Sequence, residues 1–107
     1  ANDLTMITKI PVKYLSSCYI QDMQNGGYSS TDKDLNKKLI AALIKDLNNV
    51  KKIKKDEYDY SIDINYTDSG ENYNYRNGTE ISVNIYSEYK NTLKVLNDSG
   101  VLAKLEE

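Results

Sequence analysis

A strict two-residue alternation of apolar and polar side chains runs through residues 57–66, EYDYSIDINY. The apolar set is Tyr58, Tyr60, Ile62, Ile64 and Tyr66, and the polar set is Glu57, Asp59, Ser61, Asp63 and Asn65. Successive side chains of a β-strand point to opposite faces of a sheet, so this segment predicts a strand with one dry face and one wet, acidic face. A helix would spread the same pattern around its whole circumference, which makes the alternation the strongest single constraint on the fold.

Two further segments alternate in the same way. Residues 79–89 repeat the pattern through Ile81, Val83 and Ile85. Turn signals at Ser69-Gly70 and Asn77-Gly78 separate this segment from the first, so the pair predicts an antiparallel hairpin with a long or partly stranded connection. A third strand is expected over residues 10–20, ahead of a turn at Asn25-Gly26-Gly27, with Pro11 at a strand start or sheet edge. The face of this strand that we expect to be buried is Ile10, Val12, Tyr14, Ser16, Cys18 and Ile20.

The helical signal lies between these strands. Apolar side chains recur at helical spacing at Leu35, Leu39, Ile40, Leu43 and Leu47. They predict an amphipathic helix from about residue 32 to about residue 49. Thr31 is its expected N-cap, with Asp34 as the capping-box partner. Towards the carboxyl terminus, NTLKVL (91–96) predicts a short strand, DSG (98–100) a turn, and VLAKLEE (101–107) a last helical turn.

The chain of 107 residues has the length of one domain. It contains no Phe and no Trp, so Ile, Leu, Val and the ten Tyr must form the core. We see no repeat, linker or break in composition. We therefore expect a single domain over residues 1–107 of the α+β class, in which one amphipathic helix packs on an antiparallel sheet of about four strands.

The stretch LSSC, residues 15–18, has the form of a bacterial lipobox, after which the cysteine would be lipidated. A lipobox follows an apolar segment of roughly 7 to 15 residues. The preceding residues are interrupted by Asp3, Lys9 and Pro11, so lipidation at Cys18 is not expected. We predict instead a thiol buried or half-buried in the first strand.

Composition excludes several classes of chemistry. The chain has no His, which removes the usual general base and rules out Ser-His-Asp and Cys-His catalysis. Its single Cys rules out an internal disulfide and a cysteine-rich zinc site. The formal net charge of -2 provides no field that would attract nucleic acid. We expect no catalytic residue, no cofactor, no metal and no nucleic-acid partner.

Carboxylates remain as weak candidates for chemistry. Asp59 and Asp63 should lie about 13 Å apart on one strand face, too far for a glycosidase pair, so a solvated face is favoured. Asp68, Ser69 and Glu71 in TDSGEN faintly resemble a calcium loop but lack its alternating oxygen ligands.

Basic and aromatic residues suggest contact surfaces. The KKIKK lysines at 51, 52, 54 and 55 could meet anionic lipid or wall polymers, although closing the helix end and keeping the next strand soluble explains them better. The tyrosines of the first alternating segment are expected in the core. Tyr73, Tyr75 and Arg76, in the loop between the two alternating segments, are the candidate partner-binding residues, because Tyr and Arg most often anchor interfaces. The alternative for this loop is a solvated connection.

From about Lys9 to about Val95 the chain combines a strand, a turn at NGG, the helical segment STDKDLNKKLIAALIKDLNNVKKIKK and the hairpin YDYSIDINYTDSGENYNYRNGTEISVNIY. In layout and composition it resembles the small lipoprotein domains of unknown function from clostridia and related low-G+C Gram-positive bacteria. The resemblance implies an extracytoplasmic domain of the cell envelope, held at the membrane only through a lipid anchor upstream of the chain.

Together these patterns favour a non-enzymatic binding or accessory module that contacts an unknown protein or a cell-wall component. The alternatives are a small carboxylate- or metal-dependent enzyme and an inhibitory or structural module. The missing His and the isolated Cys favour binding over catalysis.

Overall fold

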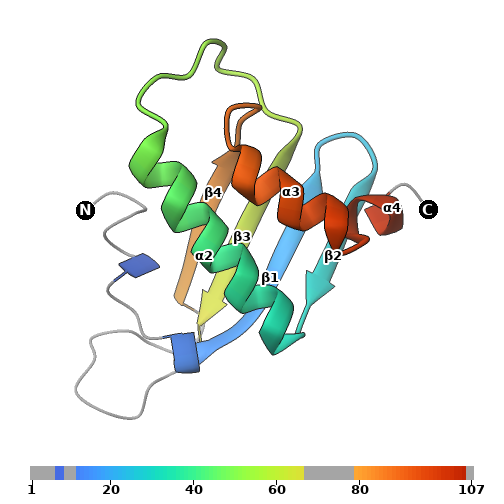
Figure 1. Ribbon diagram of the computed structural model, residues 1–107. Helices are drawn as coiled ribbons and strands as arrows, with labels where there is room; N and C mark the ends of the chain where they lie inside the picture. The colour runs from blue at the N-terminus through green and yellow to red at the C-terminus, as the bar shows by residue number, and fades with distance from the viewer. Residues whose placement is uncertain (1–6, 9–11, 67–78, 106–107) are drawn as a thin grey trace.

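A computed structural model of the protein describes residues 7–8, 12–66 and 79–105 (Figure 1). Within these ranges a hairpin and a helix are followed by a second hairpin and two more helices. In chain order the elements are η1 (Val12–Tyr14), β1 (Leu15–Asp22), β2 (Gly26–Ser30), α2 (Lys33–Asn49), β3 (Tyr60–Tyr66), β4 (Thr79–Ile85), α3 (Lys90–Asp98) and α4 (Val101–Leu105).

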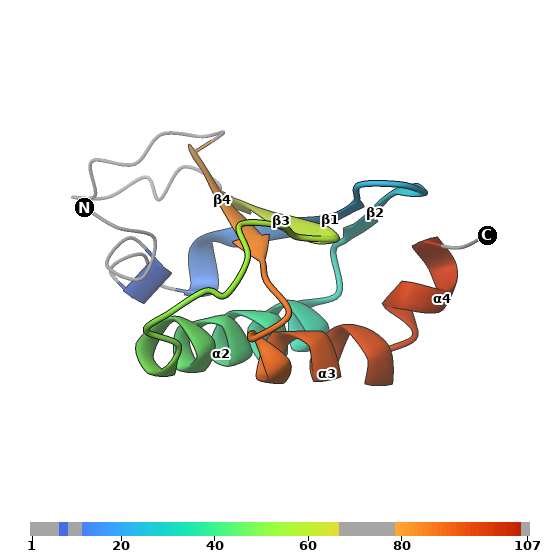
Figure 2. The same cartoon turned by 90° about the horizontal axis from the view of Figure 1, so that it is seen from above.

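The protein has two layers. Four strands form one antiparallel sheet in the order β2-β1-β3-β4. Figure 2 shows α2 and α3 side by side on one face of this sheet. The expected α+β class and the packing of the predicted helix on an antiparallel sheet are confirmed. The second helix of the layer, α3, was not predicted.

The two halves of the fold repeat one topology, a two-stranded hairpin followed by a helix. β1, β2 and α2 form the first half, and β3, β4 and α3 form the second. The central strands β1 and β3 pair with each other, with Cys18 opposite Ile64 and Ile20 opposite Ile62. The outer strands β2 and β4 lie at the two sides of the sheet, so the strand order is symmetric about the β1–β3 pair.

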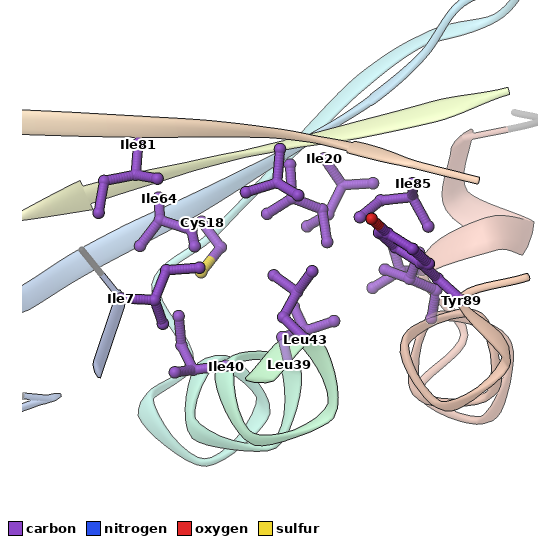
Figure 3. Close-up of a cluster of buried hydrophobic side chains, with 14 of the residues drawn as sticks. Ile7, Cys18, Ile20, Leu39, Ile40, Leu43, Ile64, Ile81, Ile85 and Tyr89 are labelled. Carbon is purple, nitrogen blue, oxygen red and sulfur yellow. The ribbon is translucent and has the colours of Figure 1, made fainter. Parts of the chain in front are cut away.

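The core lies between the sheet and the helices (Figure 3). Cys18, Ile20 and Ile64 on the sheet face Leu39 and Leu43 on α2, and all five side chains are fully buried. Burying an aliphatic side chain of this size contributes about 1.5–3 kcal/mol. The buried faces predicted for the two alternating segments are confirmed over the residues that form β3 and β4.

The tyrosines predicted for the core divide into two groups. Tyr66 is buried, and Tyr60 is half-buried and packs against the core. Tyr58 lies ahead of β3, and its ring meets the ring of Tyr86 edge-to-face at 5.8 Å.

The start of α2 differs from the prediction by one residue. Asp32, not Thr31, is the N-cap, and its Oδ1 accepts hydrogen bonds from the backbone N–H of Asp34 at 3.0 Å and of Leu35 at 3.2 Å. The expected capping box between Thr31 and Asp34 is therefore wrong, because Asp32 already satisfies the donors of the first turn. The extent of the helix agrees with the prediction.

The segment 91–96, predicted as a strand, lies in the helix α3. The buried residues of α3 are Thr92 and Leu96, four positions apart on one side of the helix, and the buried N-cap Tyr89 lies three residues before Thr92. The expected turn follows, and Gly100 has a positive φ of 84°, which glycine adopts without strain. The predicted last helical turn is α4.

Asp46 of α2 holds the start of α3. Its carboxylate accepts hydrogen bonds from the backbone N–H of Asn91 at 3.3 Å and of Thr92 at 2.7 Å. The side chains of the same two residues donate as well, Asn91 Nδ2 at 2.8 Å and Thr92 Oγ1 at 2.7 Å. The N-cap residue Tyr89 makes no side-chain capping bond. A carboxylate from the neighbouring helix therefore supplies the cap that the local sequence lacks.

The first strand also departs from the prediction. It begins at Leu15, because Val12–Tyr14 forms a 3-10 helix. Cys18 and Ile20 point into the core as expected. The pairing with β3 shifts between Leu15 and Ser17, which leaves Ser16 exposed instead of buried.

Strand β2 was not foreseen. It begins at Gly26, so the two glycines of the predicted turn at Asn25-Gly26-Gly27 belong to the strand, and the turn occupies residues 23–25. Strand β2 replaces the segment 91–96 as the fourth strand of the sheet.

Candidate binding surface

The face of the sheet opposite the helices carries a set of polar side chains, which we call the open face. Cross-strand neighbours on this face form rows, such as Ser29–Tyr19–Asp63–Ser82 across all four strands. Every member follows from the register and the strand alternation. The open face consists of Ser17, Tyr19 and Gln21 on β1, Gly27 and Ser29 on β2, Ser61, Asp63 and Asn65 on β3, and Glu80, Ser82 and Asn84 on β4.

Two hydrogen bonds fix polar groups on the open face. Ser82 Oγ donates to Asp63 Oδ1 at 2.6 Å, and Asn65 Nδ2 donates to Ser17 Oγ at 3.3 Å. Each bond joins residues on neighbouring strands, so the side chains are held at the spacing of the sheet. Ser82 is exposed, and Ser17, Asp63 and Asn65 are half-buried.

Tyr19 is the large apolar group of the open face. Its side chain is 36% exposed. A Cβ placed on Gly27 would collide with the hydroxyl end of the Tyr19 ring. The ring therefore lies diagonally across the sheet from β1 to β2, over a position where any larger residue would push it away. Glycine at position 27 allows an aromatic platform to lie flat on the sheet.

The charge of the open face is acidic. Its ionisable side chains, besides Tyr19, are Asp63 and Glu80, and the four strands contain no Lys or Arg. The outward side of the helices is different, because Lys33, Lys37 and Lys45 are all exposed there. The two layers of the protein thus present opposite charge.

The partner-binding residues predicted from the sequence, Tyr73, Tyr75 and Arg76, lie outside the described residues. They belong to the connection whose two ends, Tyr66 and Thr79, pair with each other in the sheet. The calcium-like positions Asp68, Ser69 and Glu71 belong to the same connection and also lie outside the described residues. The open face itself could have been anticipated only in part, from the polar parity of the two alternating segments.

The predicted strand thiol is confirmed. Cys18 has no exposed surface, and its burial raises the pKa of the thiol to about 12. Burial, with a smaller electrostatic effect from Cys18, also raises the pKa of the Tyr66 hydroxyl to about 12. A thiol with so high a pKa does not supply a thiolate nucleophile near neutral pH.

The KKIKK lysines are exposed in the connection that follows α2. They stand beyond the helix, whose C-cap is Val50, so they do not close its last turn. The backbone N–H of Lys54 donates to Glu88 Oε2 at 2.9 Å, and this hydrogen bond lowers the pKa of the Glu88 carboxyl. Asp59 lies just ahead of β3 and Asp63 within it, so the strand does not hold both carboxylates.

Among the described residues, no three His, Cys, Asp or Glu side chains gather closely enough to bind a metal ion. In the same part of the chain, no helix has the length and apolarity to cross a membrane. A comparison of the chain with known protein families, with curated proteins and with solved structures finds no match.

Proposed function

We propose that the protein is a non-enzymatic binding or accessory domain of the bacterial cell envelope, and that the open face is its contact surface for a wall glycan. The extracytoplasmic location and the upstream lipid anchor are parts of this proposal. They are supported by the resemblance in layout and composition. The observation that carries the binding function is the aromatic platform of Tyr19 among ordered amide and hydroxyl groups.

The chemistry of the open face favours a polyhydroxylated ligand over a protein. Hydroxyl groups of a sugar both donate and accept hydrogen bonds, which matches Gln21, Asn84 and their serine neighbours. The buried centre of a protein interface is usually rich in apolar and aromatic side chains. On the open face, Tyr19 is the single exposed large apolar group among the described residues.

The test is co-sedimentation with purified peptidoglycan. Wild-type protein should pellet with the polymer in a saturable way. Tyr19→Ala removes the platform and should weaken binding about tenfold, the equivalent of roughly 1.4 kcal/mol. Met23→Ala is the matched control, since Met23 is 46% exposed at the β1–β2 turn but lies outside the open face.

Equal binding by wild type and Tyr19→Ala would remove the open face from the function. If the domain bound an envelope protein and had no affinity for glycan, the ligand of the open face would be a protein instead of a glycan. Turnover of the glycan that is lost in Asp63→Asn would instead support the carboxylate-dependent enzyme.

A further inference from the structure

A row of three polar side chains crosses the open face beside Tyr19. Gln21 on β1 pairs with Ser61 on β3, and Ser61 pairs in turn with Asn84 on β4. We call these three residues the amide row. Strands of a sheet lie about 4.8 Å apart, so the amide row is roughly 10 Å long and a single substituted sugar can span it.

The hydrogen-bonding capacity of the amide row is unused. Within residues 7–8, 12–66 and 79–105, no hydrogen bond involves the side chain of any of its three members. Other polar groups of the open face behave differently, because Asp63 and Asn65 each form a hydrogen bond to a neighbouring strand. A side-chain amide offers both an N–H donor and a carbonyl acceptor, so the amide row presents donors and acceptors together.

Ser61, at the centre of the amide row, is the residue that points to a ligand. It is only 7% exposed, yet its hydroxyl has no hydrogen-bond partner among the described residues. In that part of the chain, the unpartnered side-chain atoms that are closed off from solvent are Ser30 Oγ and Asn36 Oδ1. Ser61 Oγ is not one of them, so it can be reached from the open face. Buried polar groups normally have a partner, and a ligand lying over Ser61 would supply it in place of water.

The hydroxyl end of Tyr19 borders the amide row. Gly27 on β2 pairs with Gln21 and so continues the row by one strand. A Cβ placed on Gly27 would collide with the Tyr19 hydroxyl group, so the ring ends beside Gln21. A sugar stacked on the Tyr19 ring therefore has a ring substituent within reach of Gln21 and Ser61.

We propose that the amide row binds the acetamido group of a 2-acetamido sugar, an assignment that rests on the glycan binding proposed above. An acetamido group holds one N–H donor and one carbonyl acceptor in a plane, and the amides of Gln21 and Asn84 can pair with both. A sugar hydroxyl in the same place is shorter and does not reach both amides. The ammonium group of a deacetylated sugar only donates, and the amide row contains no carboxylate to receive its charge.

The test is co-sedimentation with peptidoglycan whose N-acetyl groups are intact and with the same preparation after chemical N-deacetylation, at about 0.15 M salt to screen the polymer charge. Wild type should bind the acetylated polymer about tenfold or more tightly. Gln21→Ala/Ser61→Ala should bind the two polymers within about twofold of each other, through Tyr19. Asn48→Ala removes an exposed amide from α2 and should keep the wild-type preference. Ser61→Ala alone should leave the denaturation midpoint unchanged, because its hydroxyl has no partner to lose.

The outcomes separate this assignment from the glycan binding on which it rests. Equal binding of the two polymers by wild type would overturn the acetamido assignment and leave glycan binding standing, whereas binding to neither polymer would overturn both. Tighter binding to the deacetylated polymer would overturn the assignment in favour of an ammonium contact with Asp63 or Glu80. A loss of preference in Asn48→Ala equal to that in the double variant would also overturn it.

Discussion

Asp46 shows how one side chain can decide the position of a helix. It is 2% exposed, and its two carboxylate oxygens are shared among four donors from Asn91 and Thr92. A buried charge is tolerated when hydrogen bonds replace the lost hydration. The carboxylate also receives two backbone N–H groups that the first turn of α3 would otherwise leave unpaired. The residue therefore joins the two helices of the layer at a single point.

Asp46→Asn should destabilise the protein by about 2–3 kcal/mol. The NH₂ group of the new amide would face the N–H and O–H donors of Asn91 and Thr92 in a buried site, so hydrogen bonds would be lost there. The measurement is the free energy of unfolding from urea denaturation. Asp34→Asn is the control, since Asp34 is exposed in the first turn of α2 and should change stability by less than about 1 kcal/mol. Equal losses for the two variants would show that the buried contact contributes nothing beyond helix electrostatics.

Cys18 predicts a dependence of stability on alkaline pH. Its pKa is raised from 9.0 to about 12 in the folded protein, so the folded state keeps a proton that the unfolded chain releases. The stability from this difference is complete below pH 9 and is lost as the pH rises towards 12. Over this window the unfolding free energy of wild type should fall more steeply than that of Cys18→Ala, by up to about 1.4 kcal/mol per pH unit. If the unfolding free energies of wild type and Cys18→Ala fell equally with pH, the raised pKa of Cys18 would be contradicted.

Each helix of the layer depends on its buried apolar positions. Leu43 on α2 and Leu96 on α3 are both fully buried. Leu43→Ala and Leu96→Ala should each cost about 2–5 kcal/mol in unfolding free energy, through lost burial and the cavity that remains. Lys90→Ala, at the exposed start of α3, should stay within about 0.5 kcal/mol of wild type. An unchanged denaturation midpoint in Leu96→Ala would make α3 peripheral.

A helix or strand could be predicted from the sequence where its own residues carry a clear hydrophobic pattern. Strand β3 and helix α2 follow from side-chain parity and helical spacing within their own residues. Helix α3 was missed because the half-buried Leu93 and Val95 imitate a strand, and because its cap comes from Asp46, 45 positions away from Asn91. Strand β2, GGYSS, was missed because a segment of small polar residues has no apolar alternation to detect.

The open face could not be predicted without knowing which strands pair with each other. The polar parity of β3 and β4 was readable from the sequence, but the row that joins Tyr19 to Asp63 depends on the β1–β3 register. The contact of Tyr19 with Gly27 depends on β2, which was not foreseen.

At the scale of the whole molecule, the central position of Cys18 predicts cooperative unfolding. It lies on β1, between both neighbouring strands, and its side chain faces α2, so it cannot be exposed without separating the helix layer from the sheet. Urea transitions followed by far-ultraviolet circular dichroism and by the reaction of Cys18 with a thiol reagent should have the same midpoint. Exposure of the thiol at lower urea, before the helical signal is lost, would reveal a separate opening of the first half.

The symmetric order of the strands has a consequence for the growing polypeptide. β1 is synthesised well before β3, yet β3 is its partner along the centre of the finished sheet. A lone two-stranded hairpin is marginally stable at best in water. At about 5–20 residues per second, the ribosome leaves the inner side of β1 unpaired for several seconds. A bare strand of this kind readily pairs with another copy, so aggregation threatens this protein most during its synthesis.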